Sequence, residues 1–292
     1  MPYVGRFAPS PTGPLHMGSL LAALGSYLHA KSQSGLWLLR IEDLDPPRER
    51  PGADRLIIQA LQAHGLQWDG NVLYQSQRLR YYQQAIDQLL AAEHAFVCKC
   101  SRKDLAQTHG RHLGKCAVMS ADETLAVRVS VGKSVLAFND ELQGGVEQDL
   151  AAQVGDFVIK RRDGLYAYQL AVVLDDAFQQ VTHVVRGTDL LESTSRQVFL
   201  QQKLGLATPN YCHLPLLVNK IGDKLSKQNM AASLDLDAVL ENIRYCLQVL
   251  GLSAPPYLLT QDSPRALLEW AVQHWPRCVA GLQNVTKVTF VD

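Results

Sequence analysis

The stretch from Arg6 to Ser19 constrains the fold most, because it joins an apolar start to an amphipathic helix through a proline- and glycine-rich turn. Three prolines, Pro9, Pro11 and Pro14, and Gly13 exclude regular structure within the turn. Beyond it, apolar residues recur at helical spacing: Leu20, Leu21, Leu24 and Leu28. The segment therefore predicts a strand, a loop and a helix that opens between Leu15 and Ser19.

A helix that starts at this turn is a suitable place for a phosphate group. The first turn of a helix presents unpaired N–H groups and a partial positive charge, and both favour an anion. His16 can donate to a phosphate oxygen, and Gly18 lets a ligand approach the backbone closely. On these residues alone, a histidine-containing cap on an ordinary Rossmann-type unit remains the alternative.

A second polar stretch lies far downstream, after the turn Gly222-Asp223. It reads Lys224-Leu225-Ser226-Lys227-Gln228-Asn229 and places two lysines three positions apart. Lysine ammonium groups bind phosphates as point charges, so this loop could bind a polyphosphate. Taken alone, such a charge run is more often a solvated surface turn.

Together, the two stretches resemble a known pair of motifs. His16-Met17-Gly18-Ser19 and Lys224-Leu225-Ser226-Lys227 are similar to the two ATP-binding signatures of class I aminoacyl-tRNA synthetases, in the same order and with a long insertion between them. Ser19 stands where many of these synthetases have a second histidine. The resemblance implies catalytic roles for His16, Lys224 and Lys227. The implied ATP-binding residues are His16, Gly18, Ser19, Lys224, Ser226 and Lys227.

Three flanking stretches narrow the resemblance to the glutamyl/glutaminyl branch of these enzymes. They are Arg6-Phe7-Ala8-Pro9-Ser10-Pro11-Thr12-Gly13, Arg40-Ile41-Glu42-Asp43-Leu44-Asp45 and Val185-Arg186-Gly187-Thr188-Asp189-Leu190-Leu191. Within the branch, Pro14 to Leu20 and the Gln228-Asn229 pair are most similar to the glutamyl-queuosine tRNA(Asp) synthetases, a family of shortened paralogues of glutamyl-tRNA synthetase. The resemblance covers nearly the whole chain.

This resemblance implies ATP-dependent, tRNA-independent activation of L-glutamate to glutamyl-adenylate, followed by transfer of glutamate to queuosine at the wobble position of tRNA(Asp). ATP would bind together with Mg²⁺. The implied glutamate-binding residues are Arg6, Ala8, Ser10, Glu42, Tyr168 and Arg186. Arginine suits the side-chain carboxylate because its parallel N–H donors match carboxylate geometry, and Glu42 would hold the α-amino group.

Two other functions stay open. The first is a truncated glutamyl-tRNA synthetase that charges tRNA(Glu). The chain beyond Lys227 leaves no room for the separate anticodon-binding domain of those enzymes, which argues against this function. The second is a noncatalytic module that keeps an adenylate pocket. The lysine pair argues against it, because a binder would not need cations on the pyrophosphate side.

A metal site is predicted between the two motifs. Cys98 and Cys100 form a Cys-x-Cys pair, and Cys116 with one histidine, His109 or His112, would complete four ligands for one structural zinc ion. From the residues alone, unrelated reduced thiols are an equal alternative. The glutamyl-queuosine synthetases carry a similar site with a tyrosine where this chain has His112, and imidazole is the commoner zinc ligand, so the resemblance implies His112 ahead of His109.

Apolar periodicity predicts the remaining elements. Helices are expected over Ala53–His64, Leu79–Leu90, Asp237–Leu250 and Arg265–Trp275, and strands over Leu36–Ile41, Ala126–Val129, Val135–Phe138, Asp156–Lys160 and Val184–Val185. Asp163-Gly164 predicts a hairpin turn before Tyr166 to Leu174. For Asp175-Asp176, a solvated turn or a structural contact is favoured over a metal pair.

These elements predict an α/β fold, a Rossmann-type doubly wound parallel sheet with an inserted α/β subdomain. The expected divisions are 1–97, the first half of the nucleotide-binding fold; 98–185, the inserted subdomain with the zinc site; 186–234, the second half with the lysine loop; and 235–292, a helical C-terminal region. No anticodon-binding domain is expected.

Composition limits the partners. The 28 basic residues balance the 28 acidic ones, so RNA must be held by a local basic patch instead of a global positive field. Because neither a membrane span nor a signal peptide is recognisable, a cytoplasmic protein without a membrane partner is expected. Six cysteines in a chain of 292 residues do not indicate a disulfide scaffold. No repeat or coiled coil indicates more than a monomer.

Overall fold

The computed structural model describes residues 2–101, 103–112, 114, 116, 125–219, 221–222, 232–258 and 263–290, with backbone alone at 276–280. Its helices are α1 (Met17–Ser32), α2 (Ala53–Ala63), α3 (Leu79–Ala91), α4 (Leu150–Gln153), α5 (Tyr168–Phe178), α6 (Leu191–Leu204), α7 (Val239–Val249) and α8 (Arg265–Val279). Its strands are β1 (Val4–Phe7), β2 (Leu36–Ile41), β3 (Leu73–Tyr74), β4 (Ala95–Cys98), β5 (Ala126–Val129), β6 (Val135–Asp140), β7 (Gly144–Asp149), β8 (Phe157–Lys160), β9 (His183–Gly187), β10 (Asn210–Leu214), β11 (Leu216–Val218) and β12 (Lys287–Thr289).

Parallel strands form the centre of the molecule. β1 pairs in parallel with β2, and β2 continues to β3. β10 pairs in parallel with β9 and, at one position, with β6. The two groups meet where β1 lies beside β9, and there the N–H of Thr182 donates to the carbonyl of Val4 at 2.9 Å. This arrangement, with α1 crossing from β1 to β2, confirms the predicted Rossmann-type α/β fold.

The central strands separate two apolar cores. Along β1, the side chain of Phe7 enters one core, whereas that of Val4 enters the other, as the alternation of a strand requires. The first core draws on α1, α2, α7 and α8, and the second draws on α3, α5 and α6. Helices therefore cover both faces of the sheet, which is the doubly wound arrangement.

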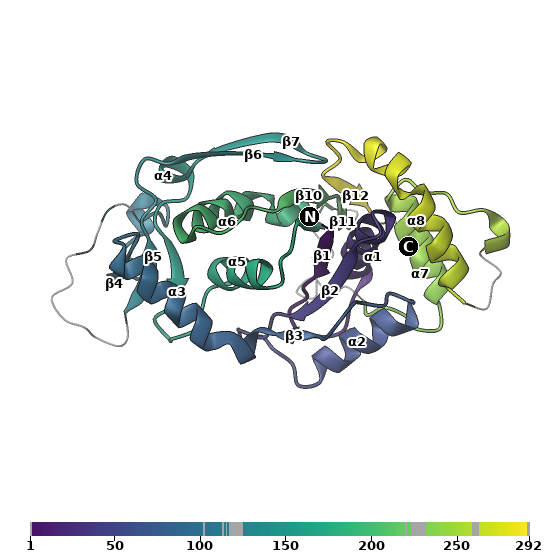
Figure 1. Ribbon diagram of the computed structural model, residues 1–292, viewed down its shortest axis with the longest axis horizontal. Helices are drawn as coiled ribbons and strands as arrows, with labels where there is room; N and C mark the ends of the chain where they lie inside the picture. Colours follow the sequence, from purple (N-terminus) through teal and green to yellow (C-terminus); the bar gives the residue numbers. More distant parts are fainter. Residues whose placement is uncertain are drawn as a thin grey trace.

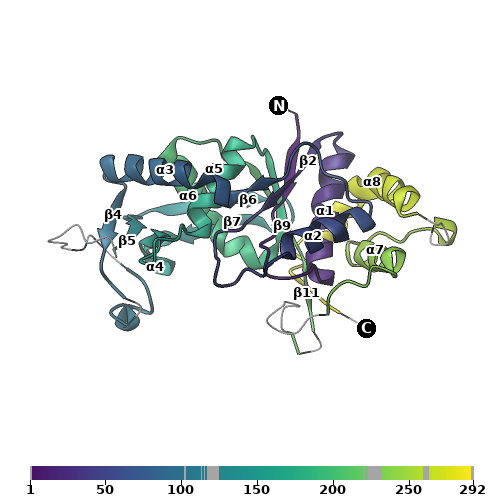
Figure 2. The same ribbon diagram turned by 90° about the horizontal axis from the view of Figure 1, so that it is seen from below.

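The molecule is elongated, and its two ends are made by different parts of the chain (Figure 1). One end holds the antiparallel sheet β4-β5-β8 together with α3 and α4. The other end holds α7 and α8, which pack against α1. The hairpin β6–β7 runs along one edge between them, and the view from below shows β4 and β5 again set apart from α7 and α8 (Figure 2).

Most predicted elements occur, with two differences. After the turn at Asp163-Gly164, the return strand shrinks to one bridge between Lys160 and Tyr166, and the chain forms α5. An apolar run buried on most sides carries no clear period, so its pattern does not separate a strand from a helix. The C-terminal region also adds strand β12, which pairs in parallel with β11. Within the described residues, no helix is long and apolar enough to cross a membrane.

Candidate active site and metal-binding cluster

A cavity of about 640 Å³ opens at the carboxyl ends of β1, β9 and β10. Open α/β sheets bind ligands at this edge, because the loops that follow the strands diverge there. The cavity is lined by residues from the turn after β1, the start of α1 and the ends of β2, β9 and β10: Arg6, Phe7, Ala8, Pro9, Ser10, Thr12, Leu15, His16, Gly18, Ser19, Leu21, Ala22, Glu42, Tyr168, Val185, Arg186, Gly187, Asp189, Leu190, Leu214, Pro215, Leu216 and Leu217.

The cavity brings together residues that lie far apart in the sequence. The six residues expected to bind glutamate all line it: Arg6, Ala8, Ser10, Glu42, Tyr168 and Arg186. So do three of the residues expected to bind ATP: His16, Gly18 and Ser19. The other three, Lys224, Ser226 and Lys227, lie outside the described residues.

The described residues on both sides of those lysines lie beside the cavity. On its N-terminal side, Leu216 and Leu217 of β11 line the cavity. On its C-terminal side, Ser233 forms an antiparallel bridge with His16, and the N–H of Leu234 donates to the carbonyl of Leu15 at 2.9 Å. Both flanks of the lysine segment are thus attached to the walls of this cavity.

His16 is the N-cap of α1 and sits at the cavity wall. Its backbone is extended, and its Nδ1 accepts a hydrogen bond from the N–H of Ser19 at 3.2 Å. The Ser19 hydroxyl lies 3.1 Å from Nε2 of the same ring. A capping side chain satisfies one of the N–H groups that a helix start leaves unpaired. The serine thereby fixes the imidazole at the helix N-terminus, the end that favours anions.

Arg6 and Glu42 belong to one buried network of charges. Asp176 of α5 accepts from Arg6 Nε at 3.1 Å and from Arg40 Nη1 at 2.7 Å, and Arg40 Nη2 donates to Glu42 at 3.2 Å. Burial opposes ionisation of Asp176, but the two guanidinium groups hold its pKa below the usual value. Burial raises the pKa of Glu42, although Arg40 and Arg6 act against that rise.

The prediction of a solvated turn at Asp175-Asp176 is wrong, whereas the structural contact is confirmed. Both side chains are buried within α5. Asp175 accepts hydrogen bonds from three side chains: Gln75 at 2.8 Å, Arg78 at 2.5 Å and Tyr82 at 2.7 Å. Since both carboxylates already bind arginine, the pair is not suited to hold a divalent ion. A buried carboxylate needs such partners, and the sequence does not show which arginines supply them.

Arg186 lines the cavity from the end of β9. Its Nη1 donates to the Tyr168 hydroxyl at 3.3 Å, its Nη2 to the Thr194 hydroxyl at 2.8 Å, and its Nε to His213 Nε2 at 3.1 Å. His213 is fully buried and contacts Asp140 through Nδ1 at 2.6 Å. Sequence reasoning missed Asp140 and His213, because a single aspartate and a single histidine at strand ends form no recognisable motif.

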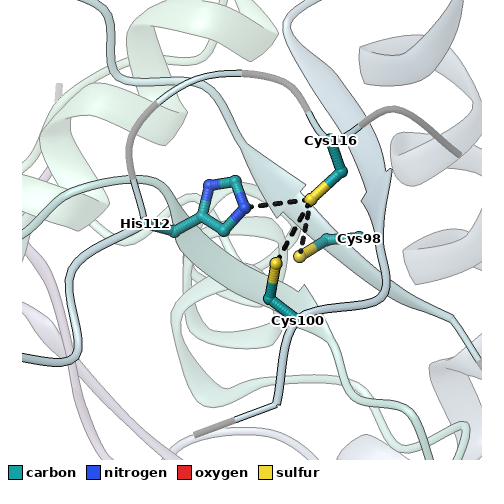
Figure 3. Close-up of side chains that lie close together, drawn as sticks. All are labelled: Cys98, Cys100, His112 and Cys116. Atoms are coloured by element: carbon teal, nitrogen blue, oxygen red, sulfur yellow. Dashed lines mark hydrogen bonds between the residues drawn. The ribbon is translucent and has the colours of Figure 1, made fainter. Parts of the chain in front are cut away.

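The four residues predicted to bind zinc converge on one point (Figure 3). Their donor atoms all lie within 4.8 Å of one another. Cys116 Sγ is 3.4 Å from Cys100 Sγ, 3.5 Å from Cys98 Sγ and 3.1 Å from His112 Nε2. A tetrahedral zinc ion with sulfur ligands needs donor separations of roughly 3.7 Å. These separations are close enough for the set to close around zinc with small side-chain adjustments.

Neighbouring groups orient the ligands as in known metal sites. Nδ1 of His112 faces the Asp156 carboxylate at 3.2 Å, which leaves Nε2 toward the sulfur atoms. Burial tends to raise the pKa of Cys98, but hydrogen bonds from the Cys100 backbone and Arg128 lower it. Gly155 has a φ of +73°, and a Cβ there would meet the His112 backbone at 2.7 Å. Only glycine allows this close approach.

A second group of possible metal ligands lies elsewhere, at the end of α1. His29, Glu141 and Cys212 have donor atoms within 4.8 Å of one another. Both nitrogens of His29 already have oxygen partners, the Tyr3 hydroxyl at 2.7 Å and Glu141 at 3.0 Å. Burial raises the pKa of the Cys212 thiol, so the thiolate that a metal requires is disfavoured. These contacts account for the group without a metal.

Comparison with known proteins identifies relatives along most of the chain. A family model described as tRNA synthetases class I (E and Q), catalytic domain, matches residues 3–245. The Glutamyl-Q tRNA(Asp) synthetase of Pseudomonas aeruginosa is 49% identical over 282 residues, which cover 94% of this chain and 96% of the relative. Proteins of the same name from Vibrio vulnificus and Photobacterium profundum are 50% and 47% identical, and the matches cover 90% and 92% of those relatives.

Solved structures give a consistent result. A glutamate tRNA ligase from Elizabethkingia meningosepticum, crystallised in complex with its amino acid, matches with a TM-score of 0.69 and 28% identity. The match covers 78% of this chain but 52% of the ligase, so this chain spans about half the length of that enzyme. The chain is therefore a ligase of the class I tRNA synthetases of the E and Q type, and within them it belongs to the glutamyl-Q tRNA(Asp) synthetase family.

Proposed function

We propose that this protein activates L-glutamate with ATP, without needing tRNA, and transfers the glutamate to queuosine at the wobble position of tRNA(Asp). The observation that carries the proposal is the shared cavity, which combines two guanidinium groups, a phenol and a carboxylate with the N-terminus of a helix. The first set suits an acidic amino acid, and the helix terminus suits phosphate. The names of the relatives support the acceptor.

The amino-acid subsite would use opposite charges at opposite ends of glutamate. Arg6 and Arg186 would supply donors for the side-chain carboxylate, together with the Tyr168 hydroxyl, which lies 3.3 Å from Arg186 Nη1. Glu42 would accept from the α-ammonium group. Arg6 already donates to Asp176 through Nε at 3.1 Å and Nη2 at 3.5 Å, so its Nη1 group would serve the substrate. A guanidinium favours a carboxylate over a neutral amide, and this preference separates glutamate from glutamine.

Catalysis of the first step would depend on position and charge. The glutamate α-carboxylate attacks the α-phosphorus of ATP in line, a new P–O bond forms, and the bond to the pyrophosphate oxygen breaks with its electron pair on pyrophosphate. His16 and the α1 N-terminus would hold phosphate oxygens, and Lys224 and Lys227 would neutralise charge on the leaving group. Mg²⁺ bound with ATP would supply further charge neutralisation. No covalent enzyme nucleophile is needed.

Zinc would have a structural role. Cys98, Cys100, His112 and Cys116 would hold one ion and connect the end of β4 to the segment that precedes β5. Cys98 ends β4, whereas the other three ligands lie outside regular structure, and a metal that closes such a connection adds order to it.

Pyrophosphate exchange in the absence of tRNA tests the activation step. Wild-type protein should exchange labelled pyrophosphate into ATP with glutamate and not with glutamine. Arg186→Gln should lower kcat/KM for glutamate by about 100-fold, because it replaces a charged donor with a neutral one. The matched control is Arg265→Gln, since Arg265 is an exposed arginine of α8 paired with Glu269. Equal activity with glutamine, or unchanged exchange in Arg186→Gln, would contradict the proposal.

A further inference from the structure

The interior behind Arg186 contains a chain of buried polar side chains. Asp140 is the last residue of β6, and His213 lies one strand away in β10. Neither residue lines the cavity, whereas Arg186 does. The contacts run from Asp140 Oδ2 to His213 Nδ1 at 2.6 Å, and from His213 Nε2 to Arg186 Nε at 3.1 Å. The side chains of Asp140 and His213 are fully buried.

Hydrogen-bond chemistry assigns the tautomer of His213. An arginine Nε–H can only donate, so His213 Nε2 must accept and carries no proton. The remaining ring proton is then on Nδ1 and is donated to Asp140. Burial lowers the pKa of His213, which agrees with a neutral ring. Burial works against ionisation of Asp140, but its bonds from His213 and the Gln143 backbone keep the pKa of Asp140 below the usual value.

The hydrogen bonds that start at Asp140 and His213 also fix the orientation of the Arg186 guanidinium group. Its Nε edge is held by His213, and its Nη2 group by the Thr194 hydroxyl at 2.8 Å and the Leu190 carbonyl at 3.4 Å. The guanidinium carbon lies 5.5 Å from the centre of the Tyr211 ring, which supports one face. Nη1 is the group that contacts Tyr168, and Tyr168 lines the cavity.

We propose that Asp140 and His213 are positioning residues that set glutamate affinity by holding Arg186 with its Nη1 group toward the amino-acid subsite. This inference rests on the proposed function. It also assigns a role in the amino-acid site to β6, which belongs to the segment expected to be an insertion, residues 98–185. Arg186 satisfies the buried acceptor at Nε2, and with the arginine turned away Nε2 keeps only the longer contact to the Thr194 hydroxyl at 3.3 Å.

Asp140→Asn tests the tautomer directly, because the variant preserves shape. Asp140 Oδ1 accepts from the backbone N–H groups of Leu142, Gln143 and His213 at 3.1, 2.9 and 3.2 Å, and the asparagine oxygen can keep all three contacts. The asparagine amide then donates to His213 Nδ1, which moves the ring proton to Nε2. The Nε2–H group of His213 would then face the Nε–H group of Arg186, so that two donors meet.

The expected result is a rise in KM for glutamate of about 10- to 100-fold, because a misplaced Arg186 would weaken the hydrogen bond to the charged substrate carboxylate. The KM for ATP should stay within about 3-fold, since ATP would not contact Arg186. His213→Leu should give the same split between the two substrates. His64→Leu is the matched control, because His64 is also fully buried and Nε2 of its ring lies 3.2 Å from the Asn242 side-chain amide, between α2 and α7. It should lower the unfolding temperature without changing either KM.

Three outcomes would overturn the inference: an unchanged KM for glutamate in a folded Asp140→Asn protein, a parallel rise in both KM values, or the same split in His64→Leu. If the variants do not fold, nitrogen NMR of histidine-labelled wild-type protein decides. It should show a neutral His213 ring protonated at Nδ1, and an imidazolium or an Nε2–H tautomer would refute the assignment. Wild-type protein without glutamate-dependent exchange would refute the proposed function instead, and the NMR result would still stand.

Discussion

At the scale of single residues, the cavity is built from charges that hold one another in place. Arg6 and Arg40 share Asp176, and Arg186 is held by His213. A buried arginine with fixed partners loses little freedom when it binds a carboxylate, so the site is preorganised for an acidic substrate. The same principle applies at the metal cluster, where Asp156 orients His112.

The metal cluster yields a prediction at this scale. Purified wild-type protein should contain about one equivalent of zinc, and Cys116→Ser should lose it, because Cys116 contacts all three of the other ligands. Cys246→Ser, which changes a buried cysteine of α7 that contacts Met17, should retain the zinc. Elemental analysis of the three proteins is the measurement. Zinc-free, folded wild-type protein would refute the site.

The sequence predicts the members of the site better than their partners. Motif resemblance names residues that line one cavity, from Arg6 near the N-terminus to Arg186, since each motif is read from a short stretch. The partners that fix these residues come from elements distant in sequence: Asp176 from α5, and Asp140 with His213 from β6 and β10. Contacts of this kind depend on the packing of strands and helices, and no local pattern encodes them.

At the scale of elements, most boundaries follow from local chemistry. The helix predicted over Ala53–His64 is α2, and Gly65 follows it with a φ of +70°, as a helix stop requires. The second strand agrees with the apolar run at Leu36–Ile41. The pattern fails where burial hides the period, as in α5, and where a short strand forms by pairing with a strand distant in sequence, as in β12. Topology decides those two cases.

Helix α8 gives a prediction about how the C-terminal region is attached. Trp275 is almost fully buried in the core shared with α1, and its ring meets His29 edge to face at 6.2 Å. Trp275→Ala should cost about 3–5 kcal/mol of unfolding free energy, because a large cavity remains. Trp275→Phe should cost less than half of that, since the indole Nε1 has no hydrogen-bond partner among the described residues. Denaturant titrations of both variants measure the difference, and equal losses would contradict this packing account.

At the scale of the whole molecule, the parallel strands whose ends line the cavity lie between two different ends of the molecule (Figure 1). The chain carries no net charge, so a general attraction to RNA is not expected to position a tRNA on it. Recognition would instead depend on local contacts. The proposed function requires the acceptor nucleoside to lie near the adenylate, and the cavity at the sheet edge provides such a place.

Transfer of labelled glutamate, with ATP, tests the central claim most directly. The acceptors to compare are purified tRNA(Asp) with queuosine, the same tRNA without queuosine, and tRNA(Glu). The account predicts label on queuosine-containing tRNA(Asp) alone. Label on tRNA(Glu) in place of tRNA(Asp) would contradict it and would identify a truncated glutamyl-tRNA synthetase instead.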